Sequence, residues 1–187
     1  MKYLRLFESF EDIDEICIKY KIKDYIINPD GTIDVNKNVY LNYRNLIKLP
    51  LKFNKVNGYF SCICNLTTLE GSPIEVNSNF NCHHNRLTSF EYAPKIIRGC
   101  FYCRNNNIKT FEYFPSFVKY HFNCYDNPIC EVWNLFEDWT KIELLNDFDI
   151  FRDENTDEPV IVMDRLNDFL LTIGRDPVEK VKGYKNI

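Results

Sequence analysis

The sequence lacks any apolar run of about 18 residues, the length that a membrane-spanning helix needs. It also lacks a recognisable secretory signal, because Glu8, Glu11 and Asp12 come before any apolar stretch of useful length. We therefore expect a cytoplasmic protein with no membrane contact. In a reducing compartment its 8 Cys are expected to be free thiols that serve as small apolar side chains.

Aromatic residues, by contrast, are plentiful at 16%, and many belong to segments that recur every 20 or 21 residues. Within a segment the apolar residues keep fixed offsets, as Phe80, Cys82, Leu87 and Phe90 show. The segments begin at Val39, Phe60, Phe80, Phe101 and Phe122. A further apolar residue follows the Pro of each complete segment, and these residues are Val56, Val76, Ile97 and Val118. Such self-similarity at a fixed period indicates a repeat architecture.

Each Phe-x-Cys stretch predicts a short strand whose Phe and Cys point inward. Stacked segments would form one parallel ladder, with Phe above Phe and thiol above thiol. The prediction buries Phe60, Phe80, Phe101 and Phe122 in one column and Cys62, Cys82, Cys103 and Cys124 in the next. Pro73, Pro94 and Pro115 fall on the far side, where we expect extended backbone without a ladder inside the turn, which tolerates a missing N–H.

An Asn follows each of these strands at the fifth offset, at Asn65, Asn85, Asn106 and Asn127. The segment at Phe60 is one residue short, and the sequence places the loss after Asn65. We expect each Asn to turn the chain out of its strand and to bond backbone groups of its own segment and the next.

The resulting string F-x-C-x-x-N-x-L resembles the leucine-rich-repeat core L-x-L-x-x-N-x-L, with the short period of the bacterial type. Phe and Cys replace the usual Leu, and Arg44 stands where the first segment should have Asn. The resemblance implies an α+β repeat protein: a short leucine-rich-repeat solenoid of about five units over residues 39–132. A solenoid needs capped ends, so we assign residues 1–38 to an N-terminal cap and 133–187 to a C-terminal helical cap.

Within the N-terminal cap, residues 8–24 have helical spacing and residues 25–41 predict a hairpin that turns at Pro29-Asp30-Gly31. The C-terminal cap predicts two helices, over 133–151 and 160–174, with Gly174 closing the second and the tail returning as an extended segment. An acidic loop, residues 153–158, divides them. The opening MKYLRLFESF, the INPDGTIDV hairpin and the ending DRLNDFLLTIG…KVKGYKNI resemble leucine-rich-repeat proteins of tailed bacteriophages. That resemblance implies a phage-encoded protein acting inside a bacterial cell.

The net charge of −4 conceals a split along the chain. Residues 39–130 hold 10 basic and 5 acidic side chains, whereas residues 131–187 hold 7 basic and 14 acidic ones. Strand alternation assigns Tyr, Asn, His and Arg side chains to an outward concave face, which is amphipathic and suited to binding. The residues predicted to contact a partner are Tyr40, Tyr59, Asn81, His83, Tyr102, Arg104, His121, Asn123 and Tyr125.

No motif predicts catalysis or a cofactor. Cys62-x-Cys64, Cys100-x-x-Cys103 and His83-His84 contain metal-ligand types, but a ladder spreads its thiols along an axis, whereas zinc needs them to converge. No nucleophile motif surrounds the Cys and His residues. We therefore expect no bound metal, no cofactor, no small-molecule substrate and no enzymatic activity.

The sequence favours a non-catalytic protein-binding module whose target is a host or phage protein, possible targets including a bacterial defence complex. One alternative is an inhibitor that binds nucleic acid or a ribonucleoprotein through a basic, aromatic concave face. Another is a structural, self-assembling viral component. The acidic C-terminal cap, with Asp153, Glu154, Asp157 and Glu158, is the alternative binding surface.

Overall fold

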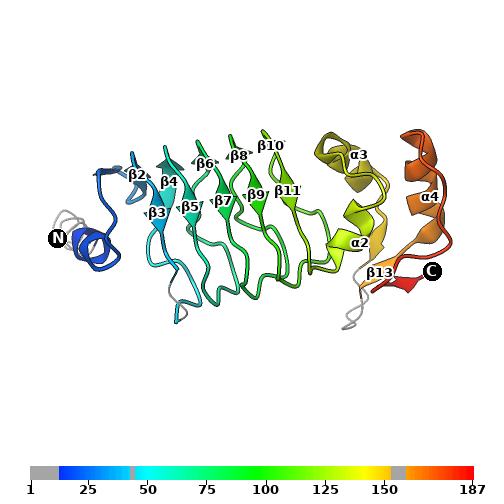
Figure 1. Ribbon diagram of the computed structural model, residues 1–187, viewed down its shortest axis with the longest axis horizontal. Helices are drawn as coiled ribbons and strands as arrows, with labels where there is room; N and C mark the ends of the chain where they lie inside the picture. The colour runs from blue at the N-terminus through cyan, green and yellow to red at the C-terminus, as the bar shows by residue number, and fades with distance from the viewer. Residues whose placement is uncertain (1–12, 43–44, 153–158) are drawn as a thin grey trace.

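The computed structural model describes residues 13–42, 45–152 and 159–187. The described chain has an α+β fold in which successive turns lie side by side along the long axis (Figure 1). We number the turns by their residues: 39–59, 60–79, 80–100, 101–121, and the turn that starts at Phe122. Equivalent strands of successive turns pair with one another and form a ladder, which we call the central ladder; Phe60, for example, pairs with Phe80. Arg44, which stands where the first segment should have Asn, lies outside the described residues.

The central ladder is a five-stranded parallel sheet in the order β11-β9-β7-β5-β3. Its strands are β3 (Val39–Tyr40), β5 (Phe60–Ser61), β7 (Phe80–Asn81), β9 (Phe101–Tyr102) and β11 (Phe122–Asn123). The predicted Phe and Cys columns are buried beneath it, and Phe101 and Cys103 are both 0% exposed. Neighbouring rings of the Phe column lie 5.4–5.7 Å apart. The parallel ladder and its two inward columns are thus confirmed.

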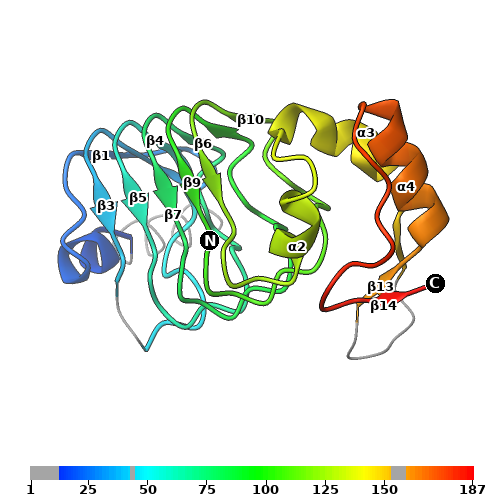
Figure 2. The ribbon, with the colours of Figure 1, turned by 45° about the vertical axis from the view of Figure 1, so that its right-hand side comes forward.

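A second ladder runs along another side of the turns, where the sequence predicted none (Figure 2). This six-stranded sheet has the order β1-β2-β4-β6-β8-β10. Its strands are β1 (Tyr25–Ile27), β2 (Ile33–Val35), β4 (Phe53–Val56), β6 (Glu75–Val76), β8 (Ile96–Ile97) and β10 (Phe117–Val118). The sequence predicted extended backbone without a ladder inside the turn, and the pairing observed here runs between successive turns. Pro73, for example, is followed by Ile74, whose N–H already bonds to Asn54 of the preceding turn, so the missing proline N–H interrupts nothing.

The apolar residue after each Pro is the inward residue of this second sheet. Val56, Val76, Ile97 and Val118 are all 0% exposed and face the Phe and Cys columns across one continuous core. The corner between the two sheets is tight. A Cβ on Gly99 would lie 2.4 Å from the Oδ1 of Asn79, whose side chain accepts a hydrogen bond from the Cys100 N–H.

The geometry that the turns share depends on buried Asn side chains. Asn85 donates to the carbonyls of Cys62 and Cys82, and its Oδ1 accepts from the N–H groups of Cys64 and Leu66. We call this set of bonds between an Asn side chain and the backbone of two turns the bracket. Asn106 and Asn127 form it one and two turns later, each accepting from one N–H where Asn85 accepts from two. The predicted backbone bonds are therefore present, but each Asn joins its own turn to the preceding one instead of the next.

In the short turn, residues 60–79, the bracket position belongs to Cys64 and not to Asn65. The Cys64 thiol donates to the carbonyl of Leu41, which is the bond that an Asn would make there. The backbone N–H of Asn65 bonds to Leu46, as that of Arg86 bonds to Leu66 one turn later. The missing residue therefore precedes Cys64, and the placement after Asn65 was wrong. The absent residue is the counterpart of His84, which has a φ of 55°.

This assignment predicts the outcome of two insertions. Inserting one Asn between Ile63 and Cys64, together with Cys64→Asn, should restore a full turn, since Asn tolerates the left-handed conformation. We expect the free energy of unfolding to rise by about 1 kcal/mol through the recovered bracket bonds. The matched control inserts the same Asn between Asn65 and Leu66, keeps Cys64 and should destabilise the protein. Urea denaturation that ranks the two insertions in the opposite order would contradict the assignment.

At the N-terminal end, residues 13–19 are helical, and the part of the predicted helix before Ile13 lies outside the described residues. The predicted hairpin is confirmed: β1 pairs antiparallel with β2, and Gly31 takes a φ of 82° in the turn. Strand β2 then pairs parallel with β4, so the hairpin extends the six-stranded sheet by two strands.

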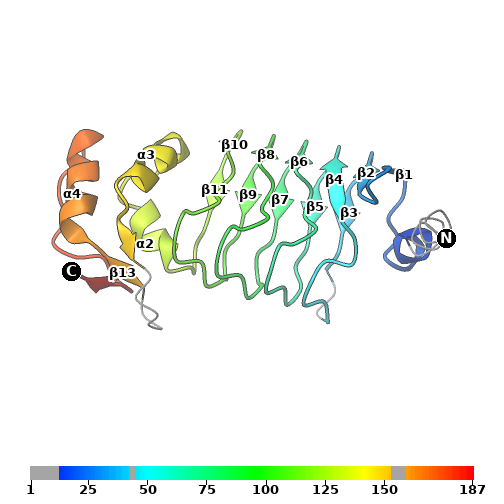
Figure 3. The same ribbon diagram turned by 180° about the vertical axis from the view of Figure 1, so that it is seen from behind.

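At the C-terminal end the first predicted helix is broken into short pieces (Figure 3). These are α2 (Ile129–Trp133), a 3-10 turn η1 (Trp139–Lys141) and α3 (Ile142–Asp147). Glu137 has a φ of 50°, which no continuing helix permits, and Asp138 then caps η1 by accepting a bond from the Thr140 N–H. The single helix over 133–151 was therefore wrong.

The second predicted helix is confirmed as α4 (Met163–Thr172), which Gly174 follows with a φ of 75°. A small sheet that the sequence did not predict lies beside it. In this sheet β13 (Val160–Ile161) pairs with β12 (Phe151–Arg152) and with β14 (Lys185–Asn186). The tail does run back as predicted, because β14 forms one edge of that sheet. The acidic loop 153–158 lies outside the described residues.

Candidate functional site

The outward side of the five-stranded sheet carries the residues that the sequence predicted to bind a partner. We call this surface the strand face; it comprises the outward side chains of β3, β5, β7, β9 and β11 and of the residues that flank them. Tyr40, Arg104, His121 and Tyr125 are exposed there, and Tyr59, His83, Tyr102 and Asn123 are half-buried. Asn81 is buried at 7% exposure, so it offers a partner almost no surface. The expectation of direct contact through Asn81 is corrected accordingly.

From its buried position, the side chain of Asn81 holds a neighbouring tyrosine of the strand face by a hydrogen bond. Its Nδ2 donates to the hydroxyl of Tyr59, the residue directly before β5, at 2.7 Å. The Tyr59 ring in turn lies 5.7 Å from that of Tyr40, whose hydroxyl accepts a bond from the Nδ2 of Asn38. These bonds fix two large amphipathic side chains before any partner arrives, which lowers the entropic cost of binding.

Tyr102 lies on β9, the strand between the edge strand β11 and the central strand β7. Its hydrogen bond with the Cys100 side chain raises the pKa of the Tyr102 hydroxyl, and burial and the nearby Tyr59 add to the effect. The hydroxyl therefore stays protonated at neutral pH and can still donate or accept a hydrogen bond. Cys100 was left without a role by the sequence, and its offset just before the strand Phe is the signal that places it beside Tyr102.

His83 is half-buried on this face, beside His84. Its ring lies 4.8 Å from that of His84, and within the described chain its buried Nδ1 has no hydrogen-bond partner. Burial lowers the pKa of His83, and the charges of Arg104 and His84 lower it further. His83 is consequently neutral at pH 7 and leaves Arg104 as the one permanent cation among the predicted contact residues.

Charge is distributed unevenly between the sides of the turns. Within residues 39–42 and 45–130, the strand face holds one cation, Arg104, and one acid, Asp126. The loops that lead from the five-stranded to the six-stranded sheet balance as well, with Lys48, Arg86 and Lys109 against Glu70, Glu91 and Glu112. The remaining cations lie on or beside the six-stranded sheet. The strand face therefore lacks the excess of basic residues beside its aromatic ones that the sequence predicted there.

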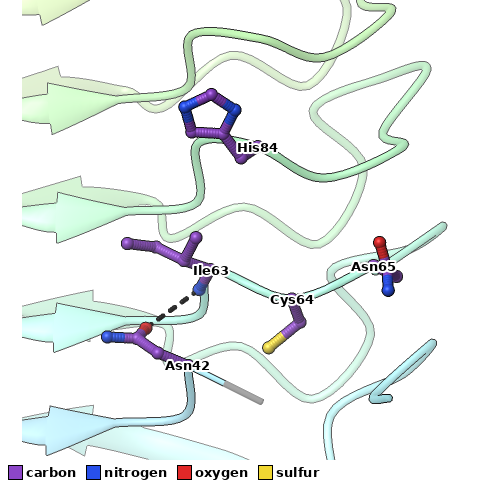
Figure 4. Close-up of a pocket in the computed structure, with 5 residues that line it drawn as sticks. All are labelled: Asn42, Ile63, Cys64, Asn65 and His84. Atoms are coloured by element: carbon purple, nitrogen blue, oxygen red, sulfur yellow. Dashed lines mark hydrogen bonds between the residues drawn. The ribbon is translucent and has the colours of Figure 1, made fainter. Parts of the chain in front are cut away.

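A hollow of about 500 Å³ opens at the edge of the strand face beside the short turn. It is lined by Asn42, Ile63, Cys64, Asn65 and His84, which come from three successive turns (Figure 4). The Oδ1 of Asn42 accepts from the Ile63 N–H at 3.0 Å and fixes that wall. The hollow lies where the missing residue before Cys64 would project, so the one-residue gap in the repeat was the signal for it.

The thiols of the inward column are poorly suited to chemistry. Burial raises the pKa of Cys62, Cys82, Cys103 and Cys124, so each remains a protonated thiol, and the thiolate is the reactive form. Across residues 13–42, 45–152 and 159–187, no group of three or more His, Cys, Asp or Glu side chains has an arrangement that could hold a metal ion. The four thiols of the inward column are therefore not activated nucleophiles.

Comparison of the chain with family models, curated proteins and solved structures gives no match. Among the helices of the described residues, none has the length and apolar character needed to cross a membrane.

Proposed function

We propose that the chain is a short leucine-rich-repeat solenoid of about five units, capped by residues 1–38 and 133–187, that acts as a non-catalytic protein-binding module. Its resemblance to repeat proteins of tailed phages supports a phage-encoded protein that acts in the host cytoplasm on a host protein complex, a defence complex among the candidates. The observation that carries the binding proposal is the row of tyrosines on the strand face, of which Tyr40 and Tyr59 are held in place by side-chain hydrogen bonds.

Three properties of the strand face favour a protein as its partner. Its aromatic side chains are fixed by hydrogen bonds, as Asn81 fixes Tyr59, and aromatic anchors dominate the energetics of protein interfaces. Its charges balance, with Arg104 against Asp126, so it lacks the cation excess that phosphate groups require. Its polar Asn, His and Tyr groups supply donors and acceptors for a partner's backbone and side chains.

Replacing both Tyr102 and Arg104 with Ala tests this proposal. We expect the affinity for the partner captured from the bacterial host to fall by about 2 kcal/mol or more, as for central anchors of an interface. The melting temperature should change little, because Arg104 is exposed and Tyr102 is half-buried on the outward side. Isothermal titration with the captured partner measures the first quantity, and circular dichroism measures the second.

The control for that experiment lies in the acidic C-terminal region. Charge reversal at Asp153, Glu154, Asp157 and Glu158 should leave the affinity nearly unchanged. If this reversal abolishes binding while the double variant at Tyr102 and Arg104 binds normally, the acidic region is the working surface and the proposal for the strand face is wrong.

A further inference from the structure

The outward side of the six-stranded sheet concentrates the positive charge of the repeat turns. We call this surface the basic face; its cations are Lys52, Lys55, Lys95, Arg98 and Lys119, each in or directly beside a strand. The acids on the same side of this sheet are Glu75 on β6 and Asp34 on β2, and each pairs in register with Lys55. The basic face therefore has a clear cation excess, whereas the strand face and the connecting loops are balanced.

Glu75 forms ion pairs with two cations in the middle of the basic face and fixes their positions there. Its carboxylate lies 2.8 Å from Nε of Arg98 and 3.5 Å from Nζ of Lys55, so one acid holds two cations from the turns on either side. The hydrogen bond with Arg98 lowers the pKa of Glu75, which keeps the pair charged. Both cations remain partly exposed, at 51% for Arg98 and 38% for Lys55.

Lys95 and Lys119 extend the charge toward the C-terminal end of the sheet. Both are exposed, and among the described residues neither forms an ion pair. Arg98 and Lys119 directly follow the paired strands β8 and β10, so they recur at the strand spacing of about 4.8 Å along the row. A line of cations with this repeat suits a polymer with closely spaced negative charges.

Two aromatic side chains lie at the same end of the basic face. Tyr120 is 65% exposed, and Nζ of Lys119 lies 5.0 Å from the centre of its ring. Phe117 is 36% exposed and packs edge-on against Trp139 at 5.8 Å. Cations beside open aromatic rings are the combination with which proteins hold single-stranded nucleic acid, through phosphate contacts and base stacking.

We propose that the basic face binds single-stranded nucleic acid, with Arg98, Lys95 and Lys119 contacting phosphates and Tyr120 stacking on a base. This surface is distinct from the strand face and does not depend on the proposed protein partner. A molecule with both surfaces would act as an adaptor that links a protein to a nucleic-acid strand.

The test uses the full chain and a fluorescein-labelled oligo-dT of about 20 nucleotides, followed by fluorescence anisotropy at about 50 mM salt. We expect Lys95→Glu combined with Lys119→Glu to weaken binding about tenfold or more. The matched control, Lys48→Glu with Arg86→Glu, makes the same change of net charge on the connecting loops and should weaken binding far less. Circular dichroism melting confirms that both pairs remain folded.

Stacking of a base on Tyr120 distinguishes nucleic acid from other polyanions, which carry negative charge but no bases. Tyr120→Ala should weaken oligo-dT binding about fivefold or more, although it removes no charge. Polyglutamate of matched charge should bind more weakly than oligo-dT. The proposal is overturned if the wild-type chain does not bind oligo-dT at low salt, if both charge-reversal pairs weaken binding equally, or if polyglutamate binds as tightly.

Discussion

Phe101→Ala should lower the free energy of unfolding by about 3–5 kcal/mol. The ring is 0% exposed and lies 5.4–5.7 Å from the rings of Phe80, Phe90 and Phe122, so its removal leaves a cavity whose walls belong to three turns. The stacked turns share one core, and the neighbouring rings cannot collapse into the space without breaking the pairing of β9 with β7 and β11.

Urea denaturation measures this loss, and Tyr113→Ala is the matched control. Tyr113 is 59% exposed on a connecting loop, so its truncation should change the free energy of unfolding by less than about 0.5 kcal/mol. A loss of less than about 1 kcal/mol at Phe101 would mean that the Phe column does not carry the core.

Asn85→Ala should cost a similar amount, about 3 kcal/mol, for a different reason. The variant removes no large apolar group but leaves four backbone groups of two turns without the partner that Asn85 provides. Each buried polar group without a partner costs about 1–3 kcal/mol, and water entering the space would recover part of that.

Asn107→Ala is the control, because Asn107 is exposed on the loop of the next turn. Its replacement should be nearly neutral in the same urea titration. Equal effects of Asn85→Ala and Asn107→Ala would show that the buried bracket contributes nothing, and the account of how the turns are joined would then be wrong.

The central ladder was predictable because every turn repeats the same pattern. Phe101 and Cys103 stand two residues apart, and the same pair recurs at a fixed period, so side-chain alternation alone places both inside. The six-stranded sheet lacks such a signal. Strand β8 has a single inward residue, Ile97, and one apolar position gives no periodicity from which a strand could be inferred.

The placement of the missing residue shows a different limit. Alignment of the repeats places the gap after Asn65, because Asn65 then matches the Asn of the other segments and Cys64 does not need to. The hydrogen bonds decide the matter, since the Cys64 thiol takes the carbonyl of Leu41 that a ladder Asn would take. The break in the predicted C-terminal helix was likewise hidden, because it depends on the local conformation of Glu137.

The sequence predicted where the candidate site lies, but it predicted the exposure and charge of the site's residues only in part. Alternation placed Tyr40, Tyr102 and Tyr125 outward, and they are exposed or half-buried. It could not predict that Asn81 would be covered, because this depends on the reach of the Tyr59 side chain across a turn. Nor could the charge of residues 39–130 as a whole reveal that its excess lies on the six-stranded sheet.

Site-specific photocrosslinking in host cells tests the central claim, that the strand face binds a protein, most directly. A photoreactive phenylalanine analogue would replace Tyr125, which is 65% exposed on the strand face, or Tyr113, which is 59% exposed on a connecting loop. The two sites match in residue type and exposure and differ in the surface that carries them. We predict a crosslink to one host or phage protein from position 125 and none from position 113. A partner crosslinked from position 113 and not from position 125 would contradict the account.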